Sequence, residues 1–314
     1  MRIVQLESLG VPEDTIQPYL DRLRAQGHTY TMYDATAPGE LAARMTGADA
    51  VVIADMALPA SAIDAAKDLR FVDVAFTGVD KVALDACRAH GVAVSNASGY
   101  ATRSVAELCV GLMIDLLRDV PAAQEHARTG LTRAGLRANE LGGRTVGIVG
   151  AGHIGRRVAA LCHAFGCRTI AYDRHPVTDP AIDEQVGLDE LFKRADLVSI
   201  HLGLYPDTRG LIDATRLKEM KPTAYLVNAA RGPIVDQAAL AGSLKDGTIA
   251  GAALDVFDTE PPLPEDAPIL NAPHLIATPH IGFYTAESLA LRARIAFDNL
   301  FAWLDGKQRN VIVP

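Results

Sequence analysis

A glycine-rich segment in the middle of the chain has the spacing of a phosphate-binding turn. Gly150, Gly152 and Gly155 follow the apolar run 146–149 and open a segment with helical periodicity. Gly150 permits a tight turn, the missing Cβ of Gly152 lets backbone approach a pyrophosphate, and Gly155 lets helix and strand pack closely. The start of such a helix offers unpaired N–H groups to phosphate. The pattern predicts a dinucleotide site, although a plain glycine-rich turn would look similar.

An acidic residue at the end of the next apolar run supports a dinucleotide site. Asp173 stands 18 positions beyond Gly155, where such sites place a carboxylate that accepts hydrogen bonds from the adenosine ribose. The same carboxylate would repel a 2′-phosphate, so Asp173 predicts NAD rather than NADP. The neighbouring Arg174 works against this discrimination.

Three further side chains stand where apolar, strand-like runs end. Arg231 lies in Asn-Ala-Ala-Arg-Gly, Glu260 in Asp-Val-Phe-Asp-Thr-Glu-Pro-Pro, and His280 in Thr-Pro-His-Ile-Gly. Open α/β sheets place their chemistry at the carboxyl ends of strands. Taken singly, each residue has an ordinary explanation, namely a surface arginine, a helix cap before prolines and a core histidine. Together they predict a catalytic set of a guanidinium, a carboxylate and an imidazole.

The segments that must position these residues alternate between strand-like and helix-like patterns. Strand candidates in the first hundred residues are 3–6, 28–33, 50–53, 71–75 and 92–95, with helical segments around 18–26, 61–67 and 82–90. A long helix is expected over 101–117 and an irregular arm over 129–143. Further strands are expected at 145–149, 168–172, 197–202, 224–228, 249–254 and 275–278, before a last helix over 286–303. This alternation predicts an α/β protein with parallel sheets covered by helices on both faces.

Composition narrows the partners of this 314-residue chain. Its net charge is −8 with 22% charged residues, and no Lys/Arg-rich run suggests nucleic acid. No apolar run of 18 residues predicts a membrane span, and Glu7 lies where a signal peptide would stay apolar. The four cysteines have no metal-ligand spacing. We interpret them as reduced, buried thiols of a cytoplasmic protein and expect no bound metal.

The motifs, in their fixed order, resemble the D-isomer-specific 2-hydroxyacid dehydrogenase family. The resemblance runs from about Phe71 to the C-terminus and includes Thr-Gly-Val-Asp at 77–80 and Ser-Val-Ala-Glu at 104–107. It implies a Rossmann cofactor domain inserted into a flavodoxin-like substrate domain. That insertion explains why the glycine motif lies in mid-chain. We expect the substrate domain at 1–98 and 285–314 and the NAD-binding domain at 99–284.

The resemblance also implies roles for the catalytic set. Arg231 would bind the carboxylate of a 2-oxo acid and polarise the adjacent ketone. His280 would donate a proton to the ketone oxygen as hydride arrives from NADH, and Glu260 would orient the imidazole. Asp255 would hold the nicotinamide carboxamide. The other residues expected to line the cofactor are His153, Ile154, His201, Thr208 and Ala229.

Substrate preference is read from a few positions near the expected binding site. Gly78 and Val79 would offer backbone N–H groups to the substrate carboxylate. Phosphoglycerate-type members carry Arg-Ser where this chain has Ala54-Asp55, and a carboxylate there would repel phosphate. Tyr100 and Tyr284 match positions of the lactate and hydroxyisocaproate type, although Phe283 and Tyr284 could equally be core aromatics. We therefore expect a 2-oxo acid with an uncharged aliphatic or aromatic side chain.

Two alternatives and two departures from the family pattern remain. An NAD(H)-sensing, corepressor-like binding protein would share the fold, and a formate or phosphite dehydrogenase fits less well because such enzymes typically replace the glutamate by glutamine. The family's usual His-x-Pro reads His201-Leu202-Gly203 here. Since the chain ends soon after the last helix, we expect no regulatory domain. The resemblance also implies a homodimer formed through the cofactor domain and the helix at 101–117, which has more apolar residues than one buried face needs.

Overall fold

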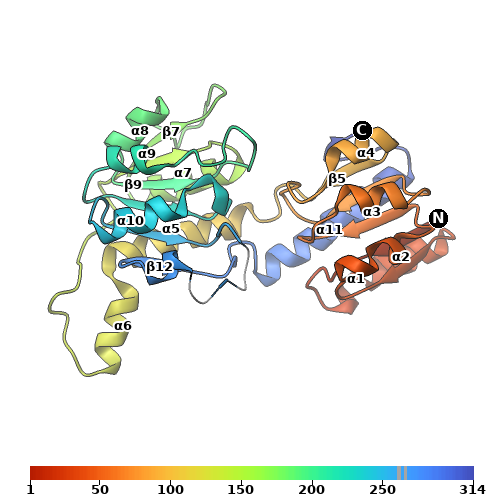
Figure 1. The fold of residues 1–314 in the computed structure, drawn as a ribbon, viewed down its shortest axis with the longest axis horizontal. Coiled ribbons are helices and arrows are strands. Elements are labelled where there is room, and N and C mark those ends of the chain that lie inside the picture. The colour runs from red at the N-terminus through yellow and green to blue at the C-terminus, as the bar shows by residue number, and fades with distance from the viewer. Residues whose placement is uncertain (260–262, 265–266) are drawn as a thin grey trace. The chain divides into compact units, whose positions relative to one another are not determined.

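The chain divides into two compact units. The computed structural model describes residues 1–259, 263–264 and 267–314 (Figure 1). The first unit comprises Met1–Ala101 with Tyr284–Pro314, and the second comprises Thr102–Phe283. Each unit is built around its own sheet. None of the described helices is long and apolar enough to span a membrane.

The first unit is a six-stranded sheet in the order β13-β5-β4-β3-β1-β2, parallel except for β13. This is the flavodoxin-like order with one antiparallel edge strand. Its strands are β1 (Arg2–Gln5), β2 (Thr29–Met32), β3 (Ala50–Ile53), β4 (Phe71–Val74), β5 (Ala93–Asn96) and β13 (Val311–Val313). Its helices are α1 (Glu13–Ala25), η1 (Pro38–Glu40), α2 (Leu41–Met45), α3 (Ala60–Ala65), α4 (Leu84–His90) and α11 (Ala286–Leu304).

Helix α11 joins the end of the chain to the first sheet. It packs on β4, β5 and α1, where the ring of Phe297 stacks on Tyr19 with centroids 4.6 Å apart. Trp303 stacks on Phe71 at 4.8 Å. The end of the chain thus completes a core that the first hundred residues begin.

The second unit is a seven-stranded sheet in the order β12-β11-β10-β9-β6-β7-β8, in which every pairing is parallel. The order reverses between β6 and β9, as in a Rossmann fold. Its strands are β6 (Thr145–Val149), β7 (Arg168–Tyr172), β8 (Glu184–Gln185), β9 (Leu197–Ile200), β10 (Tyr225–Asn228), β11 (Gly251–Leu254) and β12 (Leu275–Ala277). Its helices are α5 (Thr102–Arg118), α6 (Val120–Arg128), α7 (His153–Ala164), α8 (Leu188–Arg194), α9 (Ala214–Glu219), η2 (Gly232–Ile234), α10 (Gln237–Lys245) and η3 (Pro268–Asn271).

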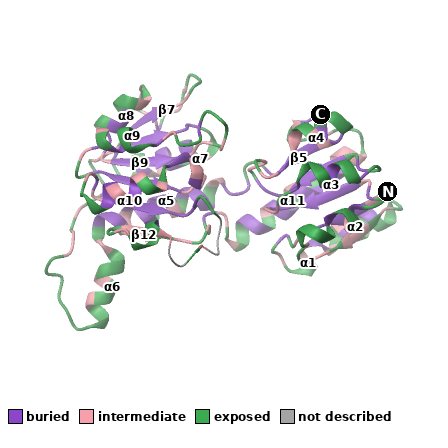
Figure 2. Ribbon diagram, viewed as in Figure 1, coloured by how far each residue is buried: buried purple, intermediate pink, exposed green. Residues whose placement is uncertain are grey.

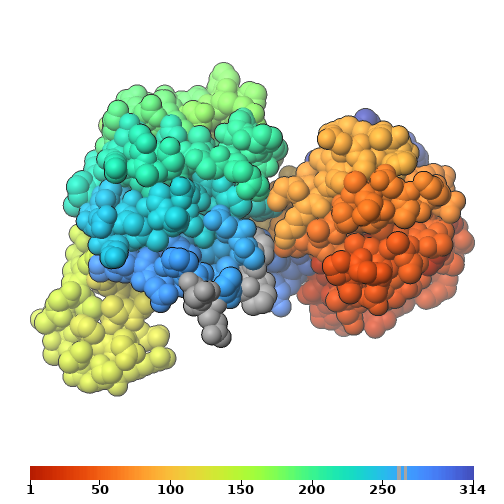
Figure 3. Space-filling view, viewed as in Figure 1, coloured from red at the N-terminus to blue at the C-terminus, as the bar shows by residue number. Residues whose placement is uncertain are grey.

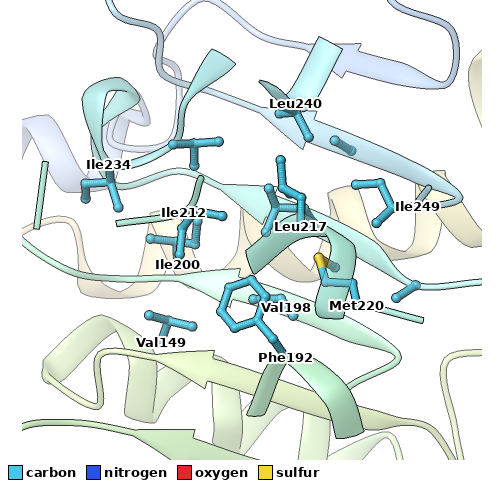
Figure 4. Packing of buried hydrophobic residues seen from close by; sticks show 14 of the residues in the cluster. Val149, Phe192, Val198, Ile200, Ile212, Leu217, Met220, Ile234, Leu240 and Ile249 are labelled. Atoms are coloured by element: carbon cyan, nitrogen blue, oxygen red, sulfur yellow. The ribbon is translucent and has the colours of Figure 1, made fainter. Parts of the chain in front are cut away.

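Side chains from strands and helices fill the core of the second unit. Phe192, Val198, Leu217 and Ile249 are almost completely buried in one cluster (Figure 4). Helices α5 and α7 contact each other and the strands β6, β7, β10 and β11. Burying this apolar surface holds the carboxyl ends of the strands in a rigid frame.

The structure confirms the predicted fold class of two doubly wound parallel sheets. Gly27 and Gly91, which follow the ends of α1 and α4, adopt positive φ values of 76° and 66°. The sequence patterns missed α6, which has no buried residue and is mostly exposed in Figure 2. Helix α6 has nine residues, and Val120 is its only large aliphatic side chain, so its sequence carries little apolar signal.

Candidate active site and cofactor site

The loop between β6 and α7 has the backbone of a phosphate-binding turn. Gly150 has φ +98°, and a Cβ built there would lie 2.9 Å from the carbonyl of His201. A Cβ at Gly155 would overlap the carbonyl oxygen of Gly150, whereas Gly152 has open space around its Cβ position. Gly150 and Gly155 are therefore required by the protein's own packing. Gly152 leaves a gap that a pyrophosphate would fill.

Asp173 is tied to this loop from the end of β7. Its Oδ2 accepts a hydrogen bond from Ala151 N at 2.9 Å, and its Oδ1 accepts one from His175 N at 3.0 Å. Arg174, next to it, forms an ion pair with Asp207 at 3.7 Å and lies 5.7 Å from the ring of Tyr205. The carboxylate is thus fixed beside the turn. The remaining lone pairs of its oxygens can accept from ribose hydroxyls.

The loop after β9 brings His201 and Thr208 to the same edge of the sheet. Burial lowers the pKa of His201 to about 3, so its ring is neutral at physiological pH. Its Nε2 is buried and has no hydrogen-bond partner among the residues that the structure describes. Thr208 donates to Gly203 O at 2.8 Å and accepts from Tyr205 N at 2.8 Å. Thr208 therefore shapes the loop itself.

Gly203, which replaces the usual proline, is explained by its neighbour. A Cβ at this position would lie 2.8 Å from the ring of Tyr205. The ring of Tyr205 packs against the backbone of Gly203, in the space that a side chain would otherwise fill.

Arg231 is held in an extended conformation after β10. Asn228 accepts from Ala230 N at 3.0 Å and donates through Nδ2 to Arg231 O at 2.9 Å. A Cβ at Gly232 would overlap the backbone of Phe257. The turn is therefore pressed against the chain that leaves β11, and Arg231, which is half-buried, stands at the carboxyl end of the sheet.

His280 lies in a strained turn after β12. Its φ is +57°, a left-handed value that is uncommon for residues other than glycine. Its N–H donates to Asp255 O at 2.9 Å. The ring of Phe283 meets its imidazole edge-on, with centroids 5.2 Å apart. Strained backbone of this kind persists only where surrounding contacts impose it.

Asp255 supplies those contacts from the end of β11. Its Oδ1 accepts from the Thr278 hydroxyl at 2.6 Å and from Ile281 N at 2.8 Å, and its Oδ2 accepts from Gly282 N at 2.8 Å. Burial raises the pKa of Asp255, although these hydrogen bonds and the charge of His280 act in the opposite direction. The carboxylate expected to hold a carboxamide thus already holds the His280 turn.

Glu260 lies outside the described residues, so the structure gives no partner for it. Ala229 is half-buried at the end of β10. His153 and Ile154 begin α7, where His153 is exposed and Ile154 is half-buried. Within the described residues, no group of three or more His, Cys, Asp or Glu side chains is arranged to hold a metal ion.

Apart from Arg231, the residues expected to bind substrate belong to the first unit. Gly78 and Val79 follow β4, and Asn96 Nδ2 donates to the adjoining Thr77 O at 2.7 Å. Tyr100 is only 3% exposed, with its ring 5.9 Å from Phe76. Tyr284 is 65% exposed, which removes its interpretation as a core aromatic.

Sequence reasoning did not assign the residues that brace the site. Asn228 and Thr278 stood inside quoted motifs, but only the fold shows that Asn228 holds the Arg231 turn and Thr278 bonds Asp255. For Asn228, which is buried at the last position of β10, the available signal was a polar residue at the end of an apolar run. Such a side chain is buried only where it has hydrogen-bond partners.

The described residues fit a dinucleotide. The space at Gly152, the fixed carboxylate of Asp173 and the buried Nε2 of His201 without a partner lie around one strand-to-helix turn. When bound, NADH would supply hydride to the substrate. These residues would hold its phosphates and ribose.

Comparison with known proteins identifies the family. Residues 110–282 match the model of the D-isomer specific 2-hydroxyacid dehydrogenase, NAD binding domain. The chain is 36% identical over 296 residues to the glycerate dehydrogenase of Methylorubrum extorquens, covering 91% of this chain and 92% of that protein. It is 40% identical over 256 residues to the D-3-phosphoglycerate dehydrogenase of Mycobacterium bovis, covering 79% of this chain but only 48% of that protein. The chain thus spans about half the length of the latter relative.

The fold also has counterparts among solved structures. An acyclic imino acid reductase in complex with NADPH and D-Arg has a TM-score of 0.92 and 26% identity, with both chains fully covered. The extent of the family match and the 36% identity along nearly the whole chain agree with the motifs and with the fold. The chain belongs to the D-isomer specific 2-hydroxyacid dehydrogenase family and is an NAD-dependent oxidoreductase that acts on CH–OH groups.

Proposed function

We propose that the protein reduces a 2-oxo acid to the D-2-hydroxy acid with NADH, and catalyses the reverse reaction. The observation that supports this most directly is the His280 turn. The buried carboxylate of Asp255 accepts from Ile281 N and Gly282 N and so fixes the backbone that carries the His280 imidazole at φ +57°. Strain of this kind is typical of catalytic positions.

The proposed chemistry uses three side chains. Arg231 binds the substrate carboxylate through its planar guanidinium and polarises the neighbouring ketone. The protonated imidazole of His280 gives its proton to the ketone oxygen as C2 receives hydride, and takes a proton back in the oxidation direction. Glu260 hydrogen-bonds the imidazole and favours its protonated form.

We propose a substrate with an uncharged side chain, aliphatic or aromatic. One relative is named for glycerate and another for 3-phosphoglycerate, which differ by a phosphate. In this chain Asp55 follows β3 and pairs with Lys81 at 2.9 Å. A carboxylate at that place disfavours a phosphorylated substrate. Gly78, Val79, Tyr100 and Tyr284 are the residues that we propose to contact the substrate.

The protein should prefer NADH to NADPH. Asp173 would repel a 2′-phosphate, and Arg174, which could attract one, is paired with Asp207 at 3.7 Å. His153, Ile154, Thr208, Ala229 and Asp255 complete the proposed cofactor contacts. For Asp255 we propose that the carboxamide shares the carboxylate with the His280 turn.

We also propose a cytoplasmic homodimer whose first unit binds substrate and whose second unit binds NAD. The four cysteines are buried and free, as is usual in a reducing compartment. Helix α6 and the loop to residue 140 form a lobe of the second unit (Figure 3). This lobe exposes apolar side chains, and a second copy would cover them.

A substrate panel tests the function. NADH oxidation should be followed with glyoxylate, hydroxypyruvate, pyruvate, 2-oxoisocaproate, phenylpyruvate and phosphohydroxypyruvate, and repeated with NADPH. Turnover of unphosphorylated 2-oxo acids with a preference for NADH is expected. A clear preference for phosphohydroxypyruvate would contradict the proposed substrate class. NADH binding without turnover of any acid would favour the sensor function, and turnover only with an added amine would favour imine reduction.

A further inference from the structure

Two backbone donors at the end of β3 already bind a carboxylate. The N–H groups of Ala54 and Met56 donate to the same oxygen, Oε1 of Glu7, at 2.6 and 2.8 Å. Glu7 lies two residues beyond β1, which pairs with β3 in parallel. Two amides that converge on one point form an anion site. The chain fills this site with its own side chain.

A positive charge on the adjacent loop, that of Lys81, is also paired with a carboxylate of the chain itself. Lys81 Nζ lies 2.9 Å from Asp55 Oδ2, and the two side chains are 34% and 32% exposed. The backbones of the two loops are also joined, because Leu58 N donates to Lys81 O at 2.9 Å. Asp55 thus neutralises the positive charge that Lys81 brings to this edge.

Both features lie on the edge of the sheet that holds Gly78 and Val79. Strands β3 and β4 are paired in parallel, and Ala75 N donates to Ile53 O at 2.6 Å. A substrate whose first carboxylate is received at Gly78 and Val79 would bring a second acidic group alongside the β3–α3 loop. There it would meet the carboxylates of Glu7 and Asp55. The amide and ammonium groups that could bind it, at Ala54, Met56 and Lys81, are already paired with those carboxylates.

We propose that Glu7 is a specificity-determining residue. It occupies the amides of Ala54 and Met56 and so excludes substrates that carry a second anionic group, whether phosphate or carboxylate. This inference rests on the proposed function and narrows it. The substrate is a 2-oxo acid whose only negative charge is its C1 carboxylate, such as glyoxylate, hydroxypyruvate or an aliphatic 2-oxo acid.

The test compares Glu7→Ala and Asp55→Asn with the wild type. The ratio of kcat/KM for phosphohydroxypyruvate to kcat/KM for hydroxypyruvate should rise in Glu7→Ala by about tenfold or more, the factor expected from one new charge-assisted hydrogen bond. Calorimetry with inorganic phosphate should show tighter binding to the same variant. Asp55→Asn releases Lys81 and should shift both quantities in the same direction by a smaller factor.

Glu40→Ala is the matched control. Glu40 also accepts a backbone N–H, from Ala37 at 3.1 Å, and pairs with Arg44 at 2.8 Å. Its removal changes the net charge equally, and both quantities should stay at their wild-type values. An equal rise in this control would overturn the proposal, because it would reflect net charge alone.

The remaining outcomes are also decisive. If thermal melting shows that Glu7→Ala does not fold, Asp55→Asn, at a half-buried side chain, decides whether the carboxylates at this loop exclude anions. Unchanged substrate ratios and phosphate affinities in every folded variant would overturn the role of Glu7. A wild-type protein that reduces no 2-oxo acid would contradict the proposed function instead. The phosphate calorimetry would then still test Glu7.

Discussion

At the scale of single residues, the Asp255 carboxylate fixes the turn that carries His280. The left-handed backbone of His280 costs free energy, on the order of 1–3 kcal/mol for such residues. Three hydrogen bonds to the Asp255 carboxylate, from Thr278, Ile281 and Gly282, hold the turn in place. Asp255 therefore acts on the imidazole by fixing the backbone on which it is mounted.

Replacing His280 by alanine should remove the proton donor and leave the cofactor site intact. We expect kcat to fall by about 10²–10⁴-fold, the usual contribution of a general acid, with the dissociation constant for NADH nearly unchanged. Steady-state rates and fluorescence titration with NADH measure the two quantities.

His274 provides a control for this variant. It also has a positive φ, of 56°, and it precedes the same strand, β12, but is exposed. His274→Ala should keep the wild-type rate. Substantial activity in His280→Ala would show that another group supplies the proton.

At the scale of elements, the β6–α7 turn separates a folding requirement from a binding requirement. Gly155 lies where a Cβ would overlap the carbonyl oxygen of Gly150, whereas a Cβ at Gly152 would meet nothing within 4 Å. Two alanine variants of the same motif should therefore fail for different reasons. One would disturb the packing of helix on strand, and the other would fill the space left for a ligand.

We expect Gly155→Ala to lower the melting temperature clearly, because overpacking of this kind costs about 1–3 kcal/mol. Gly152→Ala should melt like the wild type but bind NADH about tenfold or more weakly, since its methyl group would occupy the approach to the pyrophosphate. Differential scanning fluorimetry with and without NADH separates the two effects. Equal melting temperatures for both variants would contradict the packing argument.

The contact of β4 with α11 contains a buried acid whose titration should be visible in stability. Asp73 is fully buried and accepts from Asn299 Nδ2 at 3.1 Å. Burial holds the pKa of Asp73 well above its ordinary value, against the effect of that hydrogen bond. The folded protein therefore keeps a proton that the unfolded chain loses above about pH 4. The free energy of unfolding should therefore fall as the pH rises above about 4, until the pH reaches the raised pKa of Asp73 in the folded protein.

Asp73→Asn should remove this dependence. The variant should gain stability over the wild type as the pH rises from 5 to 8, by up to about 1.4 kcal/mol per pH unit while the proton difference persists. Melting temperatures at several pH values provide the measurement. Asp85→Asn, at a side chain that is 100% exposed, is the control. Parallel pH profiles for wild type and Asp73→Asn would refute the argument.

At the scale of the whole molecule, the lobe formed by α6 and the following loop is distinctive because the second unit does not bury α6. Helix α6 has no buried residue, and Val120 and Leu131 are 42% and 60% exposed. The lobe is nevertheless anchored, because Asp119 Oδ2 accepts from Arg137 N at 2.8 Å across its base. An anchored, uncovered segment with two exposed aliphatic side chains is suited to contact between two copies of the chain.

The double variant Val120→Asp/Leu131→Asp should therefore lower the mass measured by analytical ultracentrifugation from dimer to monomer. Two carboxylates in an apolar contact carry a desolvation penalty that the dimer cannot offset. Met32→Asp, at a side chain 38% exposed on the edge strand β2, should leave the mass unchanged. A wild-type protein that sediments as a monomer would remove the dimer from the proposal.

Local patterns predicted most of the architecture. The strands 145–149 and 168–172 were expected at the bounds where β6 and β7 lie, and α11 ends one residue beyond its expected end. Such segments are visible because their apolar residues repeat with the period of the element. The two residues of β8 are too few to show a period, and α6 has only one large aliphatic side chain, Val120, so the sequence patterns did not reveal either element.

What the sequence determined alone was the chemistry that the chain carries and the class of its fold. The glycine spacing, Asp173 and the ordered motifs around Arg231, Glu260 and His280 are local features, readable without coordinates. Only the tertiary structure decided which groups already have hydrogen-bond partners within the protein. It joins Glu7 to the amide of Ala54, 47 residues away, and Asp255 to the turn that carries His280. Both pairings depend on which strands become neighbours, and burial of the whole core sets that order.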